Sequence, residues 1–370
     1  MRLLYVVTED WYFLSHRLPM ARAARDAGFD VHVATRVVDG AAAIRAEGFT
    51  LHPVPFVRGR ILPSGTIATI RALKDIHRKV EPAIAHHVAV QASVLGAIAA
   101  RGRPAICVNA LTGLGYTFTS GGAKALLLRP VLSLLLRLLL NNPRQTVLIQ
   151  NPDDRNMMLS LGIAAERIVL IPGSGVDVEA LRPMPESRGP ITIAFVGRLL
   201  EDKGIHILIR AYELLHRRGS AVELLIAGTP DPANPASVSE QEARGWGQEP
   251  GITWLGHVED ISTVWARAHI AVLPSRREGL PKSLLEAAAC GRPMIATDVP
   301  GCREIVRPDE TGLLVPFDDD RALADAIELL AQSRERRERY GAAARRLVVE
   351  RFAAAAIGRQ TIDLYRSLVR

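Results

Sequence analysis

The sequence has few cysteines, few aromatic residues and no internal repeat, and each shortage excludes a class of protein. Its 370 residues include 3 cysteines, which share no C-x-x-C spacing and have no histidine cluster nearby, so neither a disulfide framework nor a structural zinc site is expected. Aromatic residues make up only 5%, too few for the interleaving with basic residues that is typical of nucleic-acid binding. The lack of a repeat excludes solenoid folds.

Long apolar runs are also missing. The apolar run at the N-terminus stops at Glu9 and Asp10, too early for a signal peptide. Together with the cysteine usage, this favours a cytoplasmic location. The most leucine-rich segment, KALLLRPVLSLLLRLLLNN at 124–142, is too short and too charged to cross a bilayer, which takes about 20 largely apolar residues.

Segment 124–142 leaves two interpretations open. If Pro130 begins a helix, Ser133, Arg137 and Asn141 form one narrow polar stripe along it. The helix would then belong to the core, with one edge in water. Alternatively, the segment is a basic, leucine-rich surface that rests on anionic lipid, which would make the protein peripheral on the inner face of the cytoplasmic membrane.

Acidic residues are absent between Glu81 and Asp153, a stretch that holds six basic residues. Residues 1–185 carry 21 basic and 13 acidic side chains, a balance of +8, whereas residues 186–370 carry 25 and 26, a balance of −1. The excess positive charge therefore lies in the first half of the chain. We expect this half to meet an anionic membrane surface.

The hydrophobic pattern predicts two series of alternating strands and helices. Strands are predicted at 2–7, 30–35, 83–86, 105–109 and 146–150 in the first series, and at 191–197, 222–228, 270–274, 293–297 and 311–316 in the second. Strand–helix–strand order implies parallel, doubly wound sheets. The predicted fold class is therefore α/β, with two Rossmann-like domains facing a central cleft at the ends of their strands.

The Pro-rich segment PMPESRGP at 183–190 has no periodic pattern and is taken as the domain boundary. We expect an N-terminal domain at 1–185, which in the two-domain arrangement would face a C-terminal domain at 186–351; the resemblance given below makes the first acceptor-binding and the second nucleotide-sugar-binding. Residues 352–370 are expected to form a last helix, over 352–366, that packs back towards the N-terminal domain.

The motif GRLLEDKG follows a predicted strand and carries two cations. Arg198 and Lys203 lie between Gly197 and the next predicted helix, at 204–218. Fixed cations at a strand-to-helix turn suit a diphosphate, although a solvated loop is the alternative. Lysine is rare in this chain, which strengthens the first interpretation. The lysines are Lys74, Lys79, Lys124, Lys203 and Lys282.

A second motif, REGLPKSLLEAAACGRP, places two acids eight positions apart. Glu278 lies on a loop, and Glu286 lies in the helix that Pro281 is placed to begin. The backbone N–H groups of Gly279 and Leu280 would point at an anion, aided by the helix dipole. Carboxylates accept hydrogen bonds from sugar hydroxyls, and both motifs follow strands of one domain. We therefore predict a nucleotide-sugar site.

The acids DDD at 318–320 could be mistaken for the Asp-x-Asp motif of metal-dependent transferases. They stand at the start of a predicted helix, where capping explains them. We therefore expect no metal site and no cofactor beyond the donor itself.

Together, GRLLEDKG, LPSRREGLPKSLLEAAACGRP, TDVPGCREIV and TGLLVP resemble the retaining glycosyltransferases of family 4, which have the GT-B fold. The resemblance extends over most of the chain, through LSHRLPMARAARDAGFDVHVAT, NALTGLGYTF and IPGSGVD. The sequence is similar to those of bacterial enzymes that add N-acetylhexosamines or related sugars to polyprenyl-diphosphate-linked glycans during surface polysaccharide or protein-glycan assembly.

The resemblance implies roles for the matching residues. Arg198 and Lys203 fall where the family binds the donor diphosphate, and Glu278 and Glu286 fall on its E-x7-E motif, whose acids meet the donor sugar and the ribose. Catalysis is then expected to depend on Glu278, Arg198 and Lys203, without a metal and with retention of configuration. The expected donor-binding residues are Gly197, Arg198, Lys203, Glu278, Gly279, Leu280 and Glu286.

The acceptor side departs from the family pattern. Many members carry a histidine followed by glycine after the strand that here ends near Asn109, whereas this chain has VNALTGLGYTF. The glycine-rich loop after the first strand is replaced by TEDWYFLSH. Candidate acceptor-side residues are His16, His86, His87, Asn109 and Thr112, although a lone histidine is more often structural.

The sequence thus predicts a metal-independent, retaining glycosyltransferase that uses a UDP-sugar, with UDP-N-acetylhexosamine preferred as donor. Its expected partners are this donor, a lipid-linked glycan acceptor and an anionic membrane, and no nucleic acid. The alternatives are a GDP-mannose-dependent mannosyltransferase, a UDP-sugar epimerase on the same two-domain fold, and a non-catalytic protein that binds nucleotides or glycans.

Overall fold

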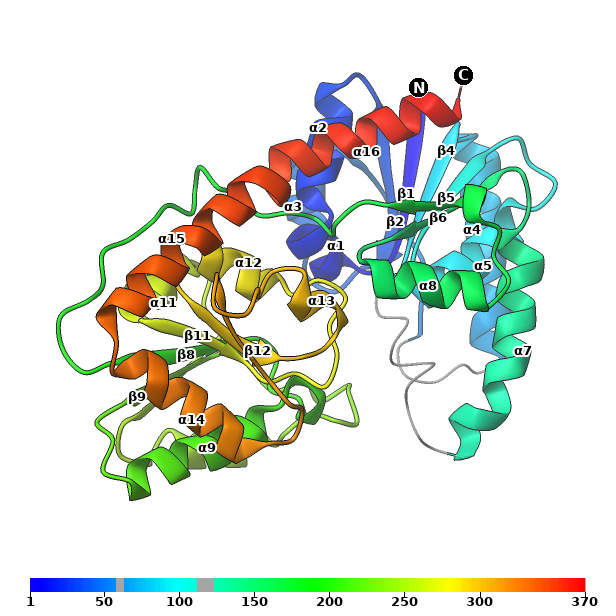
Figure 1. Cartoon of the computed structure of the whole chain (residues 1–370). Helices are drawn as coiled ribbons and strands as arrows, with labels where there is room; N and C mark the ends of the chain where they lie inside the picture. The colour runs from blue at the N-terminus through cyan, green and yellow to red at the C-terminus, as the bar shows by residue number, and fades with distance from the viewer. Residues whose placement is uncertain (58–62, 112–122, 370) are drawn as a thin grey trace. The chain divides into compact units, whose positions relative to one another are not determined.

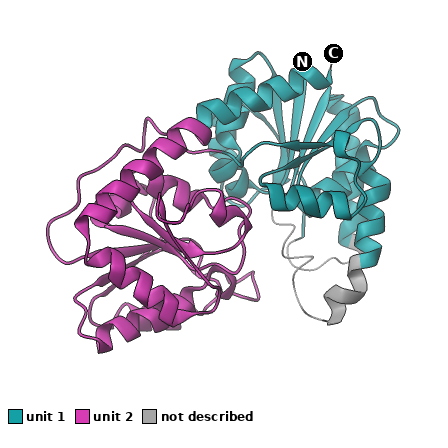
Figure 2. Cartoon of the chain, in the orientation of Figure 1, with its two compact units in different colours: residues 1–174, 354–370 teal, residues 175–353 magenta. Residues whose placement is uncertain are grey.

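The chain folds into two compact units in a computed structural model that describes residues 1–57, 63–111 and 123–369 (Figure 1, Figure 2). Unit 1 contains residues 1–174 and 354–370, and unit 2 contains residues 175–353. Each unit is built on a parallel sheet with helices on both faces, which confirms the prediction of two Rossmann-like domains.

Within the described residues, the sheet of unit 1 has seven parallel strands in the order β3-β2-β1-β4-β5-β6-β7. The strands are β1 Arg2–Glu9, β2 Asp30–Arg36, β3 Thr50–Pro53, β4 Ile84–Val88, β5 Ile106–Ala110, β6 Gln145–Ile149 and β7 Ile168–Leu170. The helices are α1 Asp10–His16, α2 Leu18–Asp26, α3 Ala41–Ala46, α4 Pro63–Val80, α5 Val90–Ala100, α7 Ala123–Leu140, α8 Pro152–Ser160 and α16 Ala354–Leu368, with a 3₁₀ turn at Ala165–Arg167.

Both faces of this sheet are buried, as expected for parallel strands that connect through helices. Successive side chains of a strand point to opposite faces, so β1 contributes to two cores. Leu3, Tyr5 and Val7 pack with side chains of α2 and α16. Leu4 and Val6 point the other way and pack with side chains of α4 and α5. The near-continuous apolar run of β1 is explained by this double burial.

Helix α16 belongs to unit 1 although the chain enters it from unit 2. It packs against α2, and the Tyr365 hydroxyl lies 3.0 Å from the Tyr5 hydroxyl and 2.5 Å from Nδ1 of His86. The last helix was expected at 352–366. It begins at Ala354 instead, because the chain leaves the helical conformation at Phe352 and Ala353.

Within the described residues, the sheet of unit 2 has six parallel strands in the order β10-β9-β8-β11-β12-β13. The strands are β8 Thr192–Val196, β9 Glu223–Ala227, β10 Ile252–Gly256, β11 Ile270–Leu273, β12 Met294–Thr297 and β13 Gly312–Val315. The helices are α9 Ile205–Arg217, α10 Glu240–Trp246, α11 Ser262–Arg267, α12 Lys282–Ala289, α13 Pro300–Arg303, α14 Asp320–Ala331 and α15 Arg334–Arg351, with a 3₁₀ turn at Glu201–Lys203.

The Pro-rich segment at 183–190 is bound to unit 2, so the division between the units falls earlier in the chain than residue 185, at Ser174 and Gly175. The guanidinium of Arg345 donates to the carbonyl oxygens of Val178 and Leu181 at 2.8 and 2.7 Å. Arg292, two residues before β12, donates to the carbonyl oxygen of Pro185 at 3.0 Å. These partly buried bonds hold the Pro-rich segment, which composition alone marked as a linker, and the residues just before it.

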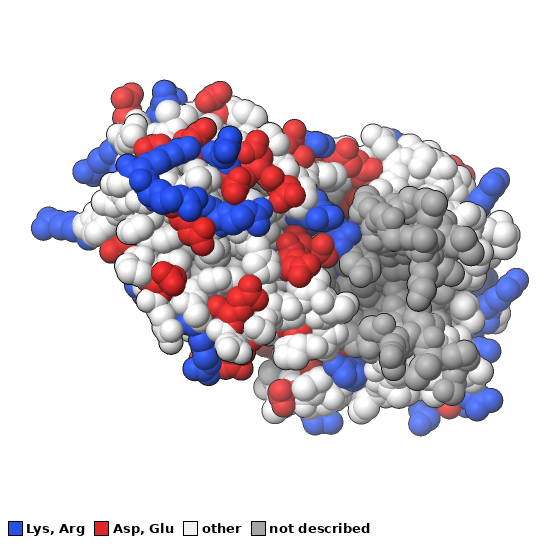
Figure 3. Space-filling model, turned by 90° about the horizontal axis from the view of Figure 1, so that it is seen from below, with Lys and Arg blue, Asp and Glu red and all other residues white. Residues whose placement is uncertain are grey.

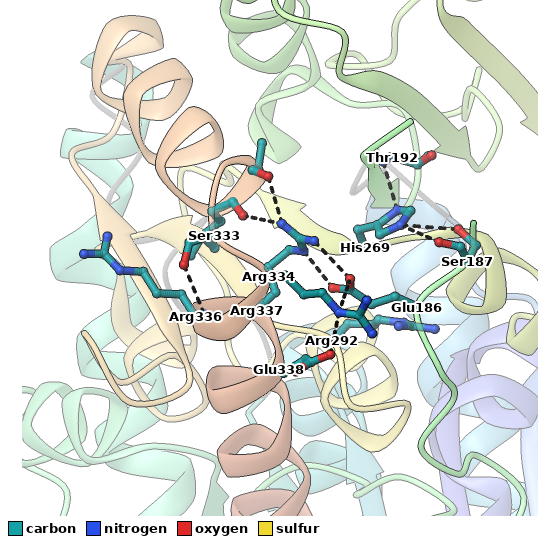
Figure 4. A network of polar contacts seen from close by, with 12 residues as sticks. Glu186, Ser187, Thr192, His269, Arg292, Ser333, Arg334, Arg336, Arg337 and Glu338 are labelled. Carbon is teal, nitrogen blue, oxygen red and sulfur yellow. Dashed lines mark hydrogen bonds and ion pairs between the residues drawn. The ribbon is translucent and has the colours of Figure 1, made fainter. Parts of the chain in front are cut away.

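A buried ion pair adds to this attachment (Figure 4). Arg337 of α15 bonds both carboxylate oxygens of Glu186, at 2.7 and 2.9 Å, and its side chain is only 4% exposed. Burial alone would raise the pKa of the Glu186 carboxyl, but the hydrogen bond and the charge of Arg337, together with the charges of His269 and Arg334, hold that pKa below its ordinary value. The pair is therefore ionised at neutral pH.

Replacing Arg337 with methionine is expected to destabilise unit 2 by about 3–5 kcal/mol, because Glu186 would lose both of its close hydrogen bonds to a buried cation and keep only the exposed Arg334 at 4.0 Å. Urea unfolding followed by tryptophan fluorescence measures this, since Trp246, Trp254 and Trp265 lie in unit 2. Arg346→Met is the matched control, because Arg346 is an exposed residue of the same helix. Equal unfolding midpoints for the two variants would contradict the structural role of the buried pair.

Helix α7 does not start at Pro130, where the sequence analysis placed a possible helix start. It begins at Ala123 and continues through Pro130, so proline does not start it, and it ends before Asn141. Leu136 and Leu140 are buried, which fits a core helix on one side. The opposite side is apolar rather than polar, with Val131, Leu134 and Leu138 exposed by 65%, 57% and 71%.

Candidate functional site

The two motifs of unit 2 meet at the point where the strand order of the sheet reverses. β8 and β11 are neighbours in the sheet, although β9 and β10 separate them in sequence. Gly197 and Arg198 follow β8, and Ser275 and Glu278 follow β11. Ligands of doubly wound sheets bind at the carboxyl ends of the strands beside such a switch point.

Close backbone packing joins the turn after β8 to the end of β11. Gly204 has φ +75°, and a Cβ atom at this position would lie 2.0 Å from the carbonyl oxygen of Pro274. Gly301, in α13, stands equally close to the second motif, since a Cβ there would lie 2.4 Å from the carbonyl oxygen of Gly279. Glycine at these two positions therefore lets three separate segments approach one another.

An ion pair links the two motifs directly. Nζ of Lys203 lies 2.6 Å from Oε1 of Glu278, and the Ser275 hydroxyl donates to the same oxygen at 2.7 Å. The Thr297 hydroxyl, at the end of β12, donates to the carbonyl oxygen of Ser275. The Glu278 side chain is 9% exposed and that of Lys203 is 24% exposed. Residues that follow β8 and β11 thus hold the carboxylate directly, and Thr297 of β12 holds the backbone of Ser275.

Two further carboxylates hold the cationic residues of the site. Asp202 accepts from Nη2 of Arg277 at 2.6 Å, and its backbone oxygen accepts from the amide of Arg276 at 2.9 Å. Asp231, in the loop after β9, accepts from Nη1 of Arg198 at 2.7 Å. The sequence prediction missed Ser275, Asp202 and Asp231. Their nearness to the ends of the predicted strands at 270–274, 191–197 and 222–228 was the only signal for them.

Glu286 is the fifth residue of α12, which confirms its prediction as a helical residue. Pro281 caps this helix, so the helix itself begins one residue later, at Lys282. Burial raises the pKa of the Glu286 carboxyl above its ordinary value, although Lys282 lies 3.3 Å away and opposes this shift. Gly279 and Leu280 lie in the loop that enters α12. Their contacts with a donor, and that of Glu286 with a ribose, stay predictions.

The acids at 318–320 cap a helix, as predicted. The Asp319 side chain accepts from the amide of Ala322 at 2.8 Å at the start of α14, and Asp318 and Asp320 each lie 3.2 Å from Arg210. Acidic and basic side chains are interspersed over the left part of the face seen in Figure 3. In the part of the chain that the structure describes, no group of three or more His, Cys, Asp or Glu residues is arranged to hold a metal ion.

Two of the three histidines predicted for the acceptor side, His86 and His87, lie in the core of unit 1. His86 and His87 are both fully buried within β4, on opposite faces of the sheet. His86 contacts Tyr365, and Nδ1 of His87 lies 2.9 Å from Oδ1 of Asn109, which is itself fully buried. These three side chains cannot reach an acceptor without opening the core.

His16 is the more accessible candidate. It ends α1, its ring stacks on Tyr12 with a centroid distance of 4.3 Å, and its Nδ1 lies 2.6 Å from the Ser15 hydroxyl. The position follows the end of β1, at the carboxyl edge of the unit 1 sheet. Thr112, the remaining candidate, lies outside the described residues.

The buried histidines predict a sensitivity of unit 1 to acid. Burial lowers the pKa of His87 to about 4 and that of His77, on α4, to about 3, so both are neutral in the folded state at pH 5. The unfolded chain binds these protons below about pH 6.5. Stability is therefore fully present above this pH and is expected to fall by about 1.4 kcal/mol per pH unit for each histidine as the pH decreases towards the folded values.

Pulse proteolysis in urea between about pH 7 and pH 5 measures this, with peptides of unit 1 quantified by mass spectrometry. His77→Phe is expected to reduce the loss of stability on acidification, because the aromatic volume stays and the proton is not bound. His216→Phe, at an exposed position of α9, is the control. An unchanged pH dependence in His77→Phe would show that other groups cause the acid sensitivity.

Within residues 1–57, 63–111 and 123–369, no helix combines the length and the apolar character of a membrane-spanning helix.

Both halves of the chain match known protein families. Residues 2–151 match the family model described as glycosyl transferase 4-like, and residues 190–333 match the model described as glycosyl transferases group 1. The second match contains every residue predicted to bind the donor. The first match contains the acceptor-side candidates.

Curated relatives of the chain are named as glycosyltransferases. The capsular polysaccharide biosynthesis glycosyltransferase CapM of Staphylococcus aureus is 32% identical over 48% of this chain and 46% of its own. The alignments with CapM and with other curated relatives cover about half of their length. The N,N'-diacetylbacillosaminyl-diphospho-undecaprenol alpha-1,3-N-acetylgalactosaminyltransferase of Campylobacter jejuni is 25% identical over 88% of this chain and 90% of its own.

A solved structure extends the likeness to the whole fold. Anabaena Alr3699/HepE, solved in complex with UDP and glucose, superimposes with a TM-score of 0.80 at 19% identity, covering 99% of this chain and all of that one. The two Rossmann-like units therefore form the GT-B fold. The chain therefore combines a glycosyl transferase 4-like domain with a glycosyl transferases group 1 domain on this fold.

Proposed function

We propose that the protein is a retaining, metal-independent glycosyltransferase of bacterial polysaccharide biosynthesis. In this proposal it moves a sugar, N-acetylhexosamine in the first instance, from a UDP-sugar to a polyprenyl-diphosphate-linked glycan. The observation that carries the proposal is the group of Arg198, Lys203 and Glu278 at the switch point of unit 2, held by the contacts described above.

The group suits the chemistry of sugar transfer. Cleavage of the bond between an anomeric carbon and a diphosphate leaves negative charge on the diphosphate. Arg198 and Lys203 are fixed cations that would stabilise this charge in the transition state. Glu278 would accept hydrogen bonds from hydroxyls of the donor sugar, and the loop amides of Gly279 and Leu280 would donate to phosphate oxygens.

The relatives support this choice of substrates. The Campylobacter jejuni relative is named for an N-acetylgalactosaminyl transfer to a diphospho-undecaprenol-linked sugar, and Anabaena HepE binds UDP and glucose. A cavity of about 440 Å³ opens at the ends of β9 and β10, between Thr229, Ser237, Trp254 and Gly256. Its volume suits a nucleoside.

Thermal-shift titration with UDP, GDP, ADP and a panel of UDP-sugars, in the presence of EDTA, tests the donor assignment. A ligand that binds only the folded protein raises the melting temperature. We expect UDP and one UDP-N-acetylhexosamine to raise it with EDTA present. A shift with GDP alone would favour the mannosyltransferase, and no shift with any nucleotide would contradict the assignment of the site.

We further propose that unit 1 binds an anionic membrane through α7, as a peripheral protein on the cytoplasmic face. Val131, Leu134 and Leu138 form an exposed apolar stripe on this helix. Leu138 shares a cavity with Arg101, Arg103 and Arg144, so the stripe borders positive charge. An apolar stripe beside arginines matches the chemistry of an anionic lipid surface.

Flotation with phosphatidylglycerol liposomes tests the membrane proposal. Leu134→Ser combined with Leu138→Ser is expected to abolish binding at low salt while circular dichroism and melting temperature stay unchanged. Leu329→Ser is the control, because Leu329 is an exposed leucine of unit 2. Binding that survives the double substitution, or a wild-type protein that does not float, would exclude this surface.

A further inference from the structure

We propose that Asp231 is a positioning residue that orients Arg198 towards the donor diphosphate, and that the loop at 229–238 exists to hold it there. This inference rests on the proposed function. Nη1 of Arg198 lies 2.7 Å from Oδ2 of Asp231. The Asp231 side chain is 12% exposed and that of Arg198 is 42% exposed, so the acid is the more firmly enclosed partner.

The loop is attached to the very turn that carries the two cations. The amide of Leu199 donates to the carbonyl oxygen of Thr229 at 3.0 Å, and the amide of Val238 donates back to the carbonyl oxygen of Leu199 at 3.1 Å. The amide of Glu201 donates to the carbonyl oxygen of Ala236 at 2.8 Å. A short antiparallel pairing thus runs beside Arg198 and ends two residues before Lys203.

The loop is also closed by bonds of its own. The Asp231 amide donates to the Ser237 hydroxyl at 2.7 Å, and the Asp231 carbonyl oxygen accepts from the amide of Asn234 at 2.7 Å. Pro232 and Pro235 restrict the backbone further. The Asp231 carboxylate is therefore presented from a rigid support.

A carboxylate in this position has two opposing effects on a diphosphate. Its charge repels the ligand, which would weaken binding. A guanidinium is a rigid fork of donors that can bond a carboxylate on one edge and phosphate oxygens on another, so the carboxylate also fixes the plane in which Arg198 meets the phosphates. We infer that the second effect is the larger one in the wild-type protein, because the pair is supported by so many contacts of the loop.

A double-mutant cycle separates the two effects, with UDP as the probe and calorimetry as the measurement. Asp231→Ala is expected to weaken UDP binding by about ten-fold when Arg198 is present. In the Arg198→Ala background the same substitution is expected to leave UDP affinity unchanged or to improve it, because only the repulsion is removed. This reversal is a result that a merely structural role of Asp231 does not produce.

Two further variants complete the test. Asp231→Asn keeps an oxygen acceptor of the same size and is expected to restore part of the lost affinity. Asp325→Asn is the matched control, because Asp325 also accepts from an arginine, Arg218, at 2.7 Å in unit 2 but lies on α14. It is expected to bind UDP like the wild type, and all variants are compared by melting temperature.

Three results would overturn the inference. The first is wild-type UDP affinity in Asp231→Ala, and the second is an equal loss of affinity in both backgrounds. The third is that every variant with weaker UDP binding also has a lower melting temperature than the wild type. If the wild-type protein binds neither UDP nor any other nucleotide, the proposed function fails and this inference fails with it, which the first titration reveals.

Discussion

Replacing Glu278 with glutamine is expected to lower the rate of sugar transfer by about a hundred-fold or more, while UDP still binds. Glutamine keeps the size of the side chain and an oxygen for Ser275, but it cannot pair with Lys203 or meet sugar hydroxyls as an anion. The expected loss is therefore in turnover rather than in folding. The measurement is the rate of UDP release from the UDP-sugar that the thermal-shift screen selects, together with a UDP titration.

Glu328→Gln is the control for this experiment. Glu328 is a carboxylate of α14 that pairs with Arg218, so the substitution removes a charge of the same kind from the same unit. Its rate is expected to equal that of the wild type. A wild-type rate in Glu278→Gln would mean that the acid of the second motif has no part in the reaction, and the candidate site would be wrong.

Replacing Lys203 with methionine is expected to weaken UDP binding by about ten-fold to a hundred-fold, because a hydrogen bond to a charged group contributes about 1.5–3 kcal/mol. Methionine keeps much of the apolar stem and removes the ammonium group. Calorimetric titration with UDP measures the effect. Lys79→Met, at an exposed position of α4 in unit 1, is the control and is expected to bind UDP normally.

Lys203 also has a structural partner, so its two roles must be separated. Lys203→Met leaves the Glu278 carboxylate without its cation, and this alone can lower the melting temperature. Combining Lys203→Met with Glu278→Gln removes the uncompensated charge and is expected to restore the melting temperature without restoring UDP affinity. If affinity returns together with stability, Lys203 acts on the fold and not on the diphosphate.

The sequence was sufficient to predict the strands that position the site. β8, β9, β11 and β12 lie within one residue of their predicted ends, because each is a short apolar run bounded by glycine or a polar turn. β3, β7 and β10 were not predicted. All three lie at the edges of their sheets and are only partly buried. The apolar run of β7 is only three residues long, and polar residues or glycine interrupt β3 and β10, so none of them has the long apolar run of a central strand.

The partners of the predicted cations could not be derived in the same way. Lys203 and Glu278 are 75 residues apart, and Arg198 and Asp231 are 33 apart. These pairs depend on which strands lie side by side. The burial of His86 and His87 also depends on strand order. Both lie in β4, a central strand that is covered on both faces, so neither side chain reaches the surface.

The return of the chain into unit 1 sets an order for folding during synthesis. Unit 2 is one continuous stretch, whereas the core of unit 1 is completed only by α16, which follows unit 2 in the chain. While α16 is still being made, Tyr5 and His86 lack the hydroxyl of Tyr365, and the apolar face of α2 is uncovered. Strand β1 must therefore wait for α16, which is made only after the whole of unit 2, so the incomplete core of unit 1 is exposed to chaperones and to aggregation during that interval.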